Sequence, residues 1–515
     1  MEKLNWPAVA EESCQSITKL ALIQNLLDEF HKRRIVYCHW KSNEHLGASM
    51  TGDTDLDILF DVKHKEELKT LFEELHFKNF KPIRQKQYKD IEDFIGLDFF
   101  SGKIVHLHAH FKLTLGETYL KGYQLNYERK ILHSRVFDNK YAIYRTHPAL
   151  ELILLFFRES LKIRHRDKLS IYFNKRIHYN GSILKEFHWL RQECSDRELK
   201  TILQELVHNY KPILTLIRGE FNRKQLLKLS MLLKKELTEQ RLYSPPKALL
   251  LRWYRELSIT ALKKLSRLLH RPVISQRINP RGGLIVAVIG ADGSGKSTIV
   301  ANLQKTFSKK LDVYRTYLGK GKADNFSWPR KILVDLKKRF ASTKKKEKNN
   351  SPKINGLTTG KVEKASFYKC VEALIVSFEK RKKLKHISAA KKKGLLVLCD
   401  RFPQNQINGY NDGPVLHHLS KENKAVFRAM SKMETRLYDY AEKNPPDLVF
   451  KLIADARIIQ ERKPSLASTE MLQSKIEGIK NLQFAEGCRV ITIDATLPLN
   501  NILSTIKKEI WNIIP

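Results

Sequence analysis

The spacing of hydrophobic residues changes twice along this 515-residue chain. In the first stretch, apolar positions recur at helical spacing over residues 20–30 and 66–75, which predicts two amphipathic helices. Short runs rich in β-branched and aromatic residues predict strands at 35–40, 56–60, 93–99 and 104–111. Residues 1–147 are therefore expected to form an α+β domain.

A helical region and then an α/β region follow this domain. Between residues 148 and 280, leucines recur every three or four positions with few helix breakers, which predicts a helical domain. The segment 279–283, Asn-Pro-Arg-Gly-Gly, predicts a linker. From 284 to 515, strand-like runs alternate with helical ones. This alternation predicts a parallel sheet with helices on both faces, that is, a three-layer α/β domain.

The strand-like run 284–289 leads into a segment with the spacing of a phosphate-binding loop, G-x-x-x-x-G-K-[ST]. Its residues are Gly290, Ala291, Asp292, Gly293, Ser294, Gly295, Lys296, Ser297 and Thr298. Glycines let backbone N–H groups and a helix N-terminus face an anion, while Lys296 reaches the phosphates and the Ser297 hydroxyl ligates Mg²⁺. The alternative is a chance glycine-rich turn, but the flanking strand and helix favour a site for ATP and Mg²⁺.

A second candidate element of the same site lies at the end of the apolar run 395–399, where Asp400 and Arg401 follow. A carboxylate at the carboxyl end of a buried strand, beside a phosphate-binding loop, is where a ligand for hydrated Mg²⁺ is needed. The adjacent Arg401 is suited to bridge donor and acceptor phosphates. The alternative for Asp400 is a simple helix cap.

Residues 284–515 resemble the thymidylate kinase family. The resemblance rests on the order of five segments: the loop containing Asp292, then Asp400-Arg401-Phe402, Pro446-Asp447-Leu448, Glu461-Arg462-Lys463 and Ile493-Asp494-Ala495. It implies transfer of the γ-phosphoryl group of ATP to a nucleoside monophosphate, with dTMP as the first expected acceptor. It also implies that Asp292 contacts the acceptor sugar, that Arg401 contacts the acceptor phosphate, and that Arg462 closes over the transferring group from a lid.

Two departures leave the acceptor open. The segment 313–320 lacks the family's arginine-glutamate-proline signature, and the segment 464–468 lacks the arginine-glycine pair of the lid. A sugar or polysaccharide precursor is therefore an alternative acceptor. A nucleotide-gated binding module, in which the loop regulates contact with a partner, is the alternative outside enzyme chemistry.

The segment 52–59 resembles the entrance to a nucleotidyltransferase fold, because Gly52-Asp53 is followed by Asp55 and Asp57 on one strand face. Side chains two apart on a strand project together, so this pair is predicted to hold Mg²⁺. The family's third carboxylate is replaced here by His106. We therefore expect an inactive or altered transferase domain that binds a nucleotide or sugar phosphate. The alternating histidines at 106, 108 and 110 are either partly exposed strand residues or metal ligands.

The composition adds a strong positive charge, formally +39 from 94 Lys and Arg against 55 Asp and Glu. Such an excess favours anionic partners, including phosphorylated small molecules. Part of it lies in the lysine-rich segment 342–360, which is expected to be a solvated loop or, alternatively, a contact for nucleic acid or another acidic surface.

The remaining expectations concern location and assembly. No apolar run approaches the roughly 20 residues that span a bilayer, and the first residues lack the apolar core of a signal peptide. The six cysteines are scattered without metal-binding spacing, which predicts reduced thiols and a cytoplasmic location. A homodimer is one of the assemblies that the sequence leaves open.

Overall fold

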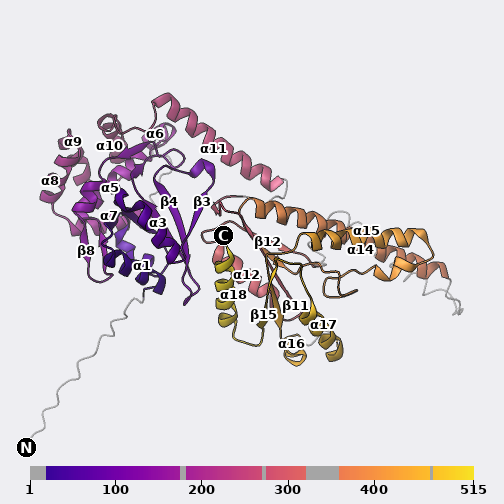
Figure 1. Ribbon diagram of the computed structural model, residues 1–515. Helices are drawn as coiled ribbons and strands as arrows, with labels where there is room; N and C mark the ends of the chain where they lie inside the picture. The colour runs from indigo at the N-terminus through magenta and orange to yellow at the C-terminus, as the bar shows by residue number, and fades with distance from the viewer. Residues whose placement is uncertain (1–18, 174–180, 269–273, 320–358, 464–467) are drawn as a thin grey trace, which may run out of the picture. The chain divides into compact units, whose positions relative to one another are not determined.

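The computed structural model describes residues 19–173, 181–268, 274–319, 359–463 and 468–515. Contacts divide the chain into two compact units (Figure 1), of which the first comprises Met1–Lys78 and Tyr88–Trp253 and the second comprises Asn79–Gln87 and Tyr254–Pro515. The predicted division into 1–147, 148–280 and 284–515 stays a prediction. Residues 342–358 of the predicted lysine-rich loop lie outside the described residues.

The first unit contains a mixed sheet whose strand order is β4-β5-β2-β1-β9-β8. Its strands are β1 Tyr37–His39, β2 Leu56–Phe60, β4 Ile91–Leu97, β5 Ile104–His110, β8 Val136–Asp138 and β9 Ile143–Arg145. A separate hairpin pairs β6 Leu113–Leu115 with β7 Tyr123–Leu125. Strands β2 and β5 are parallel, and β4 runs antiparallel to β5. The predicted strands in this region are therefore confirmed.

One hydrophobic core of this unit joins the sheet to α1 (Ala21–Lys32) and α3 (Lys65–Glu74). Both helices bury the apolar stripe that their sequence spacing predicts, since Phe30 and Phe72 are fully buried and their rings meet edge to face. The short helices α2 (Leu46–Met50) and α4 (Glu128–His133) connect strands.

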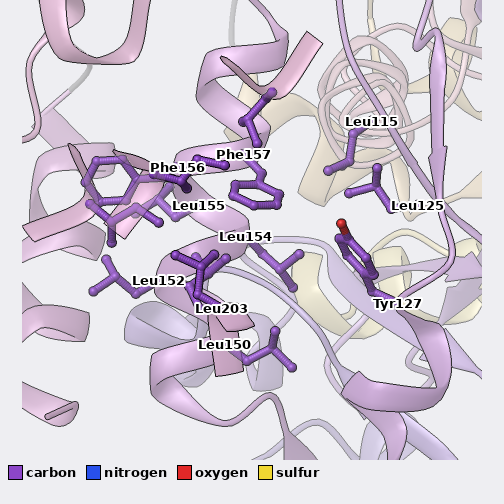
Figure 2. Close-up of a cluster of buried hydrophobic side chains, with 14 of the residues drawn as sticks. Leu115, Leu125, Tyr127, Leu150, Leu152, Leu154, Leu155, Phe156, Phe157 and Leu203 are labelled. Carbon is purple, nitrogen blue, oxygen red and sulfur yellow. The ribbon is translucent and has the colours of Figure 1, made fainter. Parts of the chain in front are cut away.

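A second core is built mainly by helices, as the leucine spacing predicts. These helices are α5 Pro148–Leu161, α6 His165–Tyr172, α7 Gly181–Glu193, α8 Asp196–Leu206, α9 Tyr210–Arg218 and α10 Arg223–Glu236. The longer helix α11, Pro245–Leu268, follows them in the chain. Figure 2 shows α5 at its centre, with Leu154 and Phe157 pointing toward Tyr127 and Leu125. Helix α5 is buried almost all round, which fits the run of apolar residues from Leu152 to Phe157 in its sequence.

The second unit contains a fully parallel sheet with strand order β12-β13-β11-β14-β15. Its strands are β11 Leu284–Gly290, β12 Val313–Tyr317, β13 Leu396–Asp400, β14 Leu448–Ile453 and β15 Arg489–Asp494. A short pair, β10 (Arg277–Ile278) with β3 (Lys78–Pro82), runs antiparallel. The mixed α/β class with a parallel sheet is thus confirmed.

Helices cover both faces of the parallel sheet. They are α12 Lys296–Phe307, α14 Thr359–Lys392, α15 Ala425–Lys443, α16 Ala456–Arg462, α17 Thr469–Asn481 and α18 Leu499–Ile513. The chain moves across the sheet in one direction from β11 to β12 and in the opposite direction from β12 to β13. Because crossovers between parallel strands are right-handed, these two connections place α12 and α14 on opposite faces. Helix α18 lies beside α12 (Figure 1), and Trp511 stacks on Phe307 at 6.4 Å between ring centroids.

Within the described part of the chain, no helix is both long enough and apolar enough to cross a membrane.

Candidate functional site

The phosphate-binding segment lies at the carboxyl end of the central strand β11, as its sequence position predicts. Gly293 and Gly295 both have φ of 92°, a left-handed conformation that only glycine adopts without strain. Gly295 is the N-cap of α12, so the first turn of the helix points its free N–H groups into the loop. At Gly290, a β-carbon would lie 2.5 Å from Ser294 Oγ and 2.9 Å from the backbone carbonyl oxygen of Leu452, so a larger residue would force the strand or the loop to shift.

Lys296 begins α12 and turns its side chain back over the loop. Its Nζ donates hydrogen bonds to the carbonyl oxygens of Gly290 at 2.9 Å and Ala291 at 2.7 Å. The side chain is only 5% exposed. Burial, helped by the nearby Arg401 guanidinium, lowers the pKa of Lys296 to about 8 despite the opposing carboxylates of Asp292 and Asp400. The ammonium is thus enclosed at the base of the loop.

Ser297 and Asp400 meet beside this loop. The Ser297 hydroxyl donates a hydrogen bond of 2.6 Å to Asp400 Oδ2. Asp400 is buried, and its Oδ1 has no hydrogen-bond partner among the described residues. A hydroxyl and a carboxylate are hard oxygen ligands of the kind that Mg²⁺ prefers, and an unsatisfied buried carboxylate oxygen is suited to a cation or its water. These residues therefore fit Mg²⁺.

Strand pairing explains why residues more than 100 positions apart converge here. β13 lies directly beside β11, with Asp400 in register with Val288. Parallel strands end at one edge of the sheet, so the carboxyl end of β13 opens beside the loop that follows β11. β13 and β14 flank β11 on either side, and ligands of open α/β sheets bind at such a crevice.

Arg401 follows with a left-handed backbone, φ 75°, which is unfavourable for a residue with a β-carbon. Its own N–H is held by the Val288 carbonyl at 3.0 Å. The guanidinium pairs with Asp292 and with Asp412 Oδ2, the latter at 3.2 Å. Burial alone would lower the pKa of Arg401, but the carboxylates of Asp412 and Asp292 raise it above its usual value. The guanidinium is therefore fixed as a cation beside the phosphate-binding loop.

A cavity of about 500 Å³ opens next to this arginine. Its wall includes Asp292 and Arg401 from the predicted site, Asp412 from a turn, and charged side chains from helices α14, α15 and α17: Lys369, Glu372, Lys380, Glu434 and Lys475. The aromatic rings of Tyr317 and Tyr438 complete part of the wall. A cavity with several cations and fixed hydrogen-bond acceptors is suited to a polar, anionic small molecule.

The structure does not bring every predicted residue to this point. Arg462 ends α16, and its guanidinium donates a hydrogen bond to the Ala495 carbonyl at 3.0 Å. No contact from Arg462 to the phosphate-binding segment is recorded among the described residues, and most of the predicted lid, 464–467, lies outside them. Thr298 is exposed on the first turn of α12, and Ser294 is buried within the loop.

A second polar cluster lies in the first unit, where Asp55 and Asp57 were predicted to bind Mg²⁺. Asp55 Oδ1 lies 2.9 Å from His106 Nδ1, and His106 Nε2 lies 2.8 Å from Asp93. Asp57 Oδ1 contacts His108 Nδ1 at 2.9 Å, His110 Nε2 at 3.6 Å and Lys41 Nζ at 3.0 Å. We refer to Asp55, Asp57, Asp93, His106, His108 and His110 as the Asp/His cluster.

Of the three histidines that one interpretation of the sequence expected to be partly exposed, only His108 is, with 17% of its side chain accessible. His106 and His110 are both 1% exposed. Burial lowers the pKa of His108 and lowers that of His110 far below its usual value, although the Asp57 carboxylate opposes both shifts. Burial would raise the pKa of Asp57, but the Lys41 ammonium and the two histidines hold it well below normal. Because Mg²⁺ prefers oxygen ligands, this imidazole-rich donor set does not fit it.

Some of these residues could not be found by inspecting motifs. Asp412, which pairs with Arg401, and Lys380, which lies 3.7 Å from Asp412, belong to segments without a recognisable signature. Asp93 lies opposite His108 across β4 and β5, a register that the sequence does not disclose. Around Asp412 the sequence indicates a turn, through the run Gly-Tyr-Asn-Asp-Gly at 409–413, but no binding site.

The sequence of this chain is similar to those of two proteins of Escherichia coli strain K12. Over 230 residues, or 44% of this chain and 86% of the relative, the chain is 26% identical to "Uncharacterized ATP-binding protein YghR". Over 229 residues, or 44% of this chain and 92% of the relative, it is 25% identical to "Uncharacterized ATP-binding protein YghS". No family model matches the chain.

Proposed function

We propose that the second unit binds ATP with Mg²⁺ and transfers its γ-phosphoryl group to a small anionic acceptor held in the cavity beside Arg401. One observation carries the proposal: Lys296, the Ser297–Asp400 pair and Arg401 converge at the carboxyl edge of a parallel sheet, next to a cavity with several cations. The relatives named ATP-binding proteins support the nucleotide part of this proposal.

The chemistry needs positioned charge more than covalent help. In phosphoryl transfer, negative charge on the transferring group must be neutralised while the acceptor is held in line. The α12 N-terminus and Lys296 would hold the donor phosphates. Ser297 and Asp400 would hold Mg²⁺, which when bound supplies further neutralisation of the phosphates. Arg401, a permanent cation at the mouth of the cavity, would hold the anionic group of the acceptor.

For the acceptor we propose a nucleoside monophosphate, with dTMP tested first. The cavity has a cation for a phosphate and, in Asp292, a carboxylate that can accept a hydrogen bond from a sugar hydroxyl once Arg401 turns to the ligand. The second candidate is a sugar or polysaccharide precursor. It is favoured by the additional carboxylates Glu372 and Asp412 in the same wall, which suit several hydroxyl groups.

The test is an ATP-consumption assay on the full-length protein with a panel of nucleoside monophosphates, sugars and sugar phosphates. We expect turnover with one class and its loss in Lys296→Ala. The matched control is Lys305→Ala, which changes an exposed lysine on the same helix. ATP binding without turnover on any acceptor would favour a nucleotide-gated binding module. Equal turnover in both variants would contradict the proposed site.

A further inference from the structure

We infer that Asp57, His108 and His110 form a binding site for a divalent first-row transition-metal ion of the Zn²⁺ type. The inference concerns the first unit and does not depend on the phosphoryl transfer proposed for the second. It starts from three ligand atoms that converge on one point: Asp57 Oδ1, His108 Nδ1 and His110 Nε2.

Strand geometry places these side chains together. His108 and His110 are two residues apart on β5, so they project from the same face of the sheet. In the parallel pairing of β2 and β5, Asp57 is the register partner of His108. The three residues therefore lie on rigid neighbouring strands rather than on loops, which suits a preorganised site.

The spacing of the three atoms matches tetrahedral coordination. They lie 2.9, 3.3 and 3.6 Å from one another. Ligand atoms at 2.0–2.1 Å from Zn²⁺ in a tetrahedron are separated by about 3.3 Å. Two imidazoles and one carboxylate, with a position left for water or substrate, form a ligand set that Zn²⁺ and Fe²⁺ accept.

Hydrogen bonds alone explain the same contacts poorly. Suppose first that His108 Nδ1 carries the proton, donates it to Asp57 and shares it with His110 Nε2. The lone pairs of His110 Nε2 and Asp57 Oδ1 then face each other. If His110 Nε2 carries the proton instead and donates to His108, the lone pair of His108 faces the Asp57 carboxylate at 2.9 Å. If both nitrogens carry protons and donate to Asp57, their two N–H groups face each other at 3.3 Å. Each arrangement leaves one close contact unfavourable, whereas a cation at the centre satisfies all three.

The surroundings fit a metal site as well. His108 Nε2 lies 4.0 Å from Asp93, beyond direct hydrogen-bond distance, on the side of the ring away from the three ligand atoms. A carboxylate there attracts the ring N–H that remains when Nδ1 binds a metal. The rings of Trp40 and His110 pack edge to face, with their centroids 5.2 Å apart, which restrains the His110 ring. Lys41 shares Asp57 Oδ1 with the proposed ion, so its partly exposed ammonium would have to move outward on binding.

The experiment uses the full-length protein freed of metal with a chelator. Zn²⁺ affinity is measured by competition with a chromophoric chelator, and Co²⁺ is added separately as a spectroscopic probe of nitrogen and oxygen coordination. We expect one tight Zn²⁺ equivalent that excess Mg²⁺ does not displace. His108→Gln and His110→Gln should each weaken it by about a hundredfold or more and abolish the Co²⁺ visible band, since each removes a ligand.

The matched control is His133→Gln, an exposed histidine at the end of α4, which should bind Zn²⁺ like the unmodified chain. Because His110 is buried, circular dichroism and urea unfolding must accompany its variant. Asp57→Asn, on the more accessible side of the cluster, provides a second test if His110→Gln unfolds. Equal Zn²⁺ affinity in the unmodified chain and in folded His108→Gln would overturn the inference, as would the absence of any tight equivalent.

Discussion

The Ser297 hydroxyl donates a hydrogen bond of 2.6 Å to the Asp400 carboxylate. Ser297 lies on α12, the helix that follows β11, and Asp400 is the last residue of the neighbouring strand β13. The carboxylate oxygen that Ser297 leaves free is buried and has no hydrogen-bond partner in the described parts of the chain. Leaving a buried acceptor unsatisfied typically costs about 1–3 kcal/mol, so an arrangement of this kind is better explained by a ligand than by stability.

The first prediction concerns this pair. We expect Asp400→Asn to reduce the gain in ATP affinity that Mg²⁺ provides by about ten- to a hundredfold, because the amide loses the negative charge that attracts the cation. ATP binding is measured by calorimetry with and without Mg²⁺. Asp439→Asn, an exposed carboxylate on α15, is the control and should keep the full Mg²⁺ effect. Identical Mg²⁺ dependence in both variants would argue against Asp400 as a ligand.

The second prediction uses the pKa of Lys296, lowered to about 8 by burial. A lysine whose pKa is lowered on folding destabilises the folded state while it is charged. This penalty is fully present below about pH 8 and disappears as pH rises toward the usual value near 10.5. Lys296→Met should therefore raise the free energy of unfolding at pH 7, on the order of 2–3 kcal/mol, while greatly weakening ATP binding.

Urea unfolding at pH 7 and pH 9.5 checks the stability half of this prediction. The advantage of Lys296→Met over the unmodified chain should shrink at the higher pH. Lys305→Met, on the exposed face of α12, should show no such pH dependence. If Lys296→Met is less stable than the unmodified chain at both pH values, the buried ammonium contributes to folding rather than opposing it.

The third prediction separates the backbone of Arg401 from its side chain. Its left-handed φ costs roughly 1–2 kcal/mol for a residue with a β-carbon, and glycine avoids that cost. Arg401→Gly should accordingly be about 1 kcal/mol more stable than Arg401→Ala by urea unfolding. Both should lose turnover with a phosphorylated acceptor to a similar extent, since both lack the guanidinium. Wild-type rates in either variant would contradict the role proposed for the side chain.

The fourth prediction concerns Lys41, which competes with the proposed metal ion for Asp57 Oδ1. Lys41→Met removes a positive charge about 3 Å from a ligand oxygen, so Zn²⁺ affinity should rise by about tenfold. Lys63→Met, an exposed lysine paired with Asp61, serves as the control. A loss of Zn²⁺ affinity in Lys41→Met would indicate that the ammonium helps to build the site instead of competing for it.

The sequence predicted those parts of the fold that depend on local pattern. The β11–loop–α12 segment follows from an apolar run, glycines at fixed spacing and a helical stripe, and the structure has these elements where they were predicted. The pairing of Arg401 with Asp412 could not be predicted, because a turn 11 residues later must fold back onto it. The Asp93–His106 contact was equally hidden, since it depends on the placement of β4 beside β5.

The Asp/His cluster also affects how strands β2 and β5 align when the first unit folds. Asp57 lies beside His108 only in one register of β2 against β5, and a shift by one residue would put Leu107 or Ala109 in its place. A misaligned sheet would then bury a carboxylate among apolar side chains, which is strongly unfavourable. The Asp/His cluster would thus disfavour misaligned pairings of β2 with β5. Metal uptake during refolding would then report how many molecules have aligned these strands correctly.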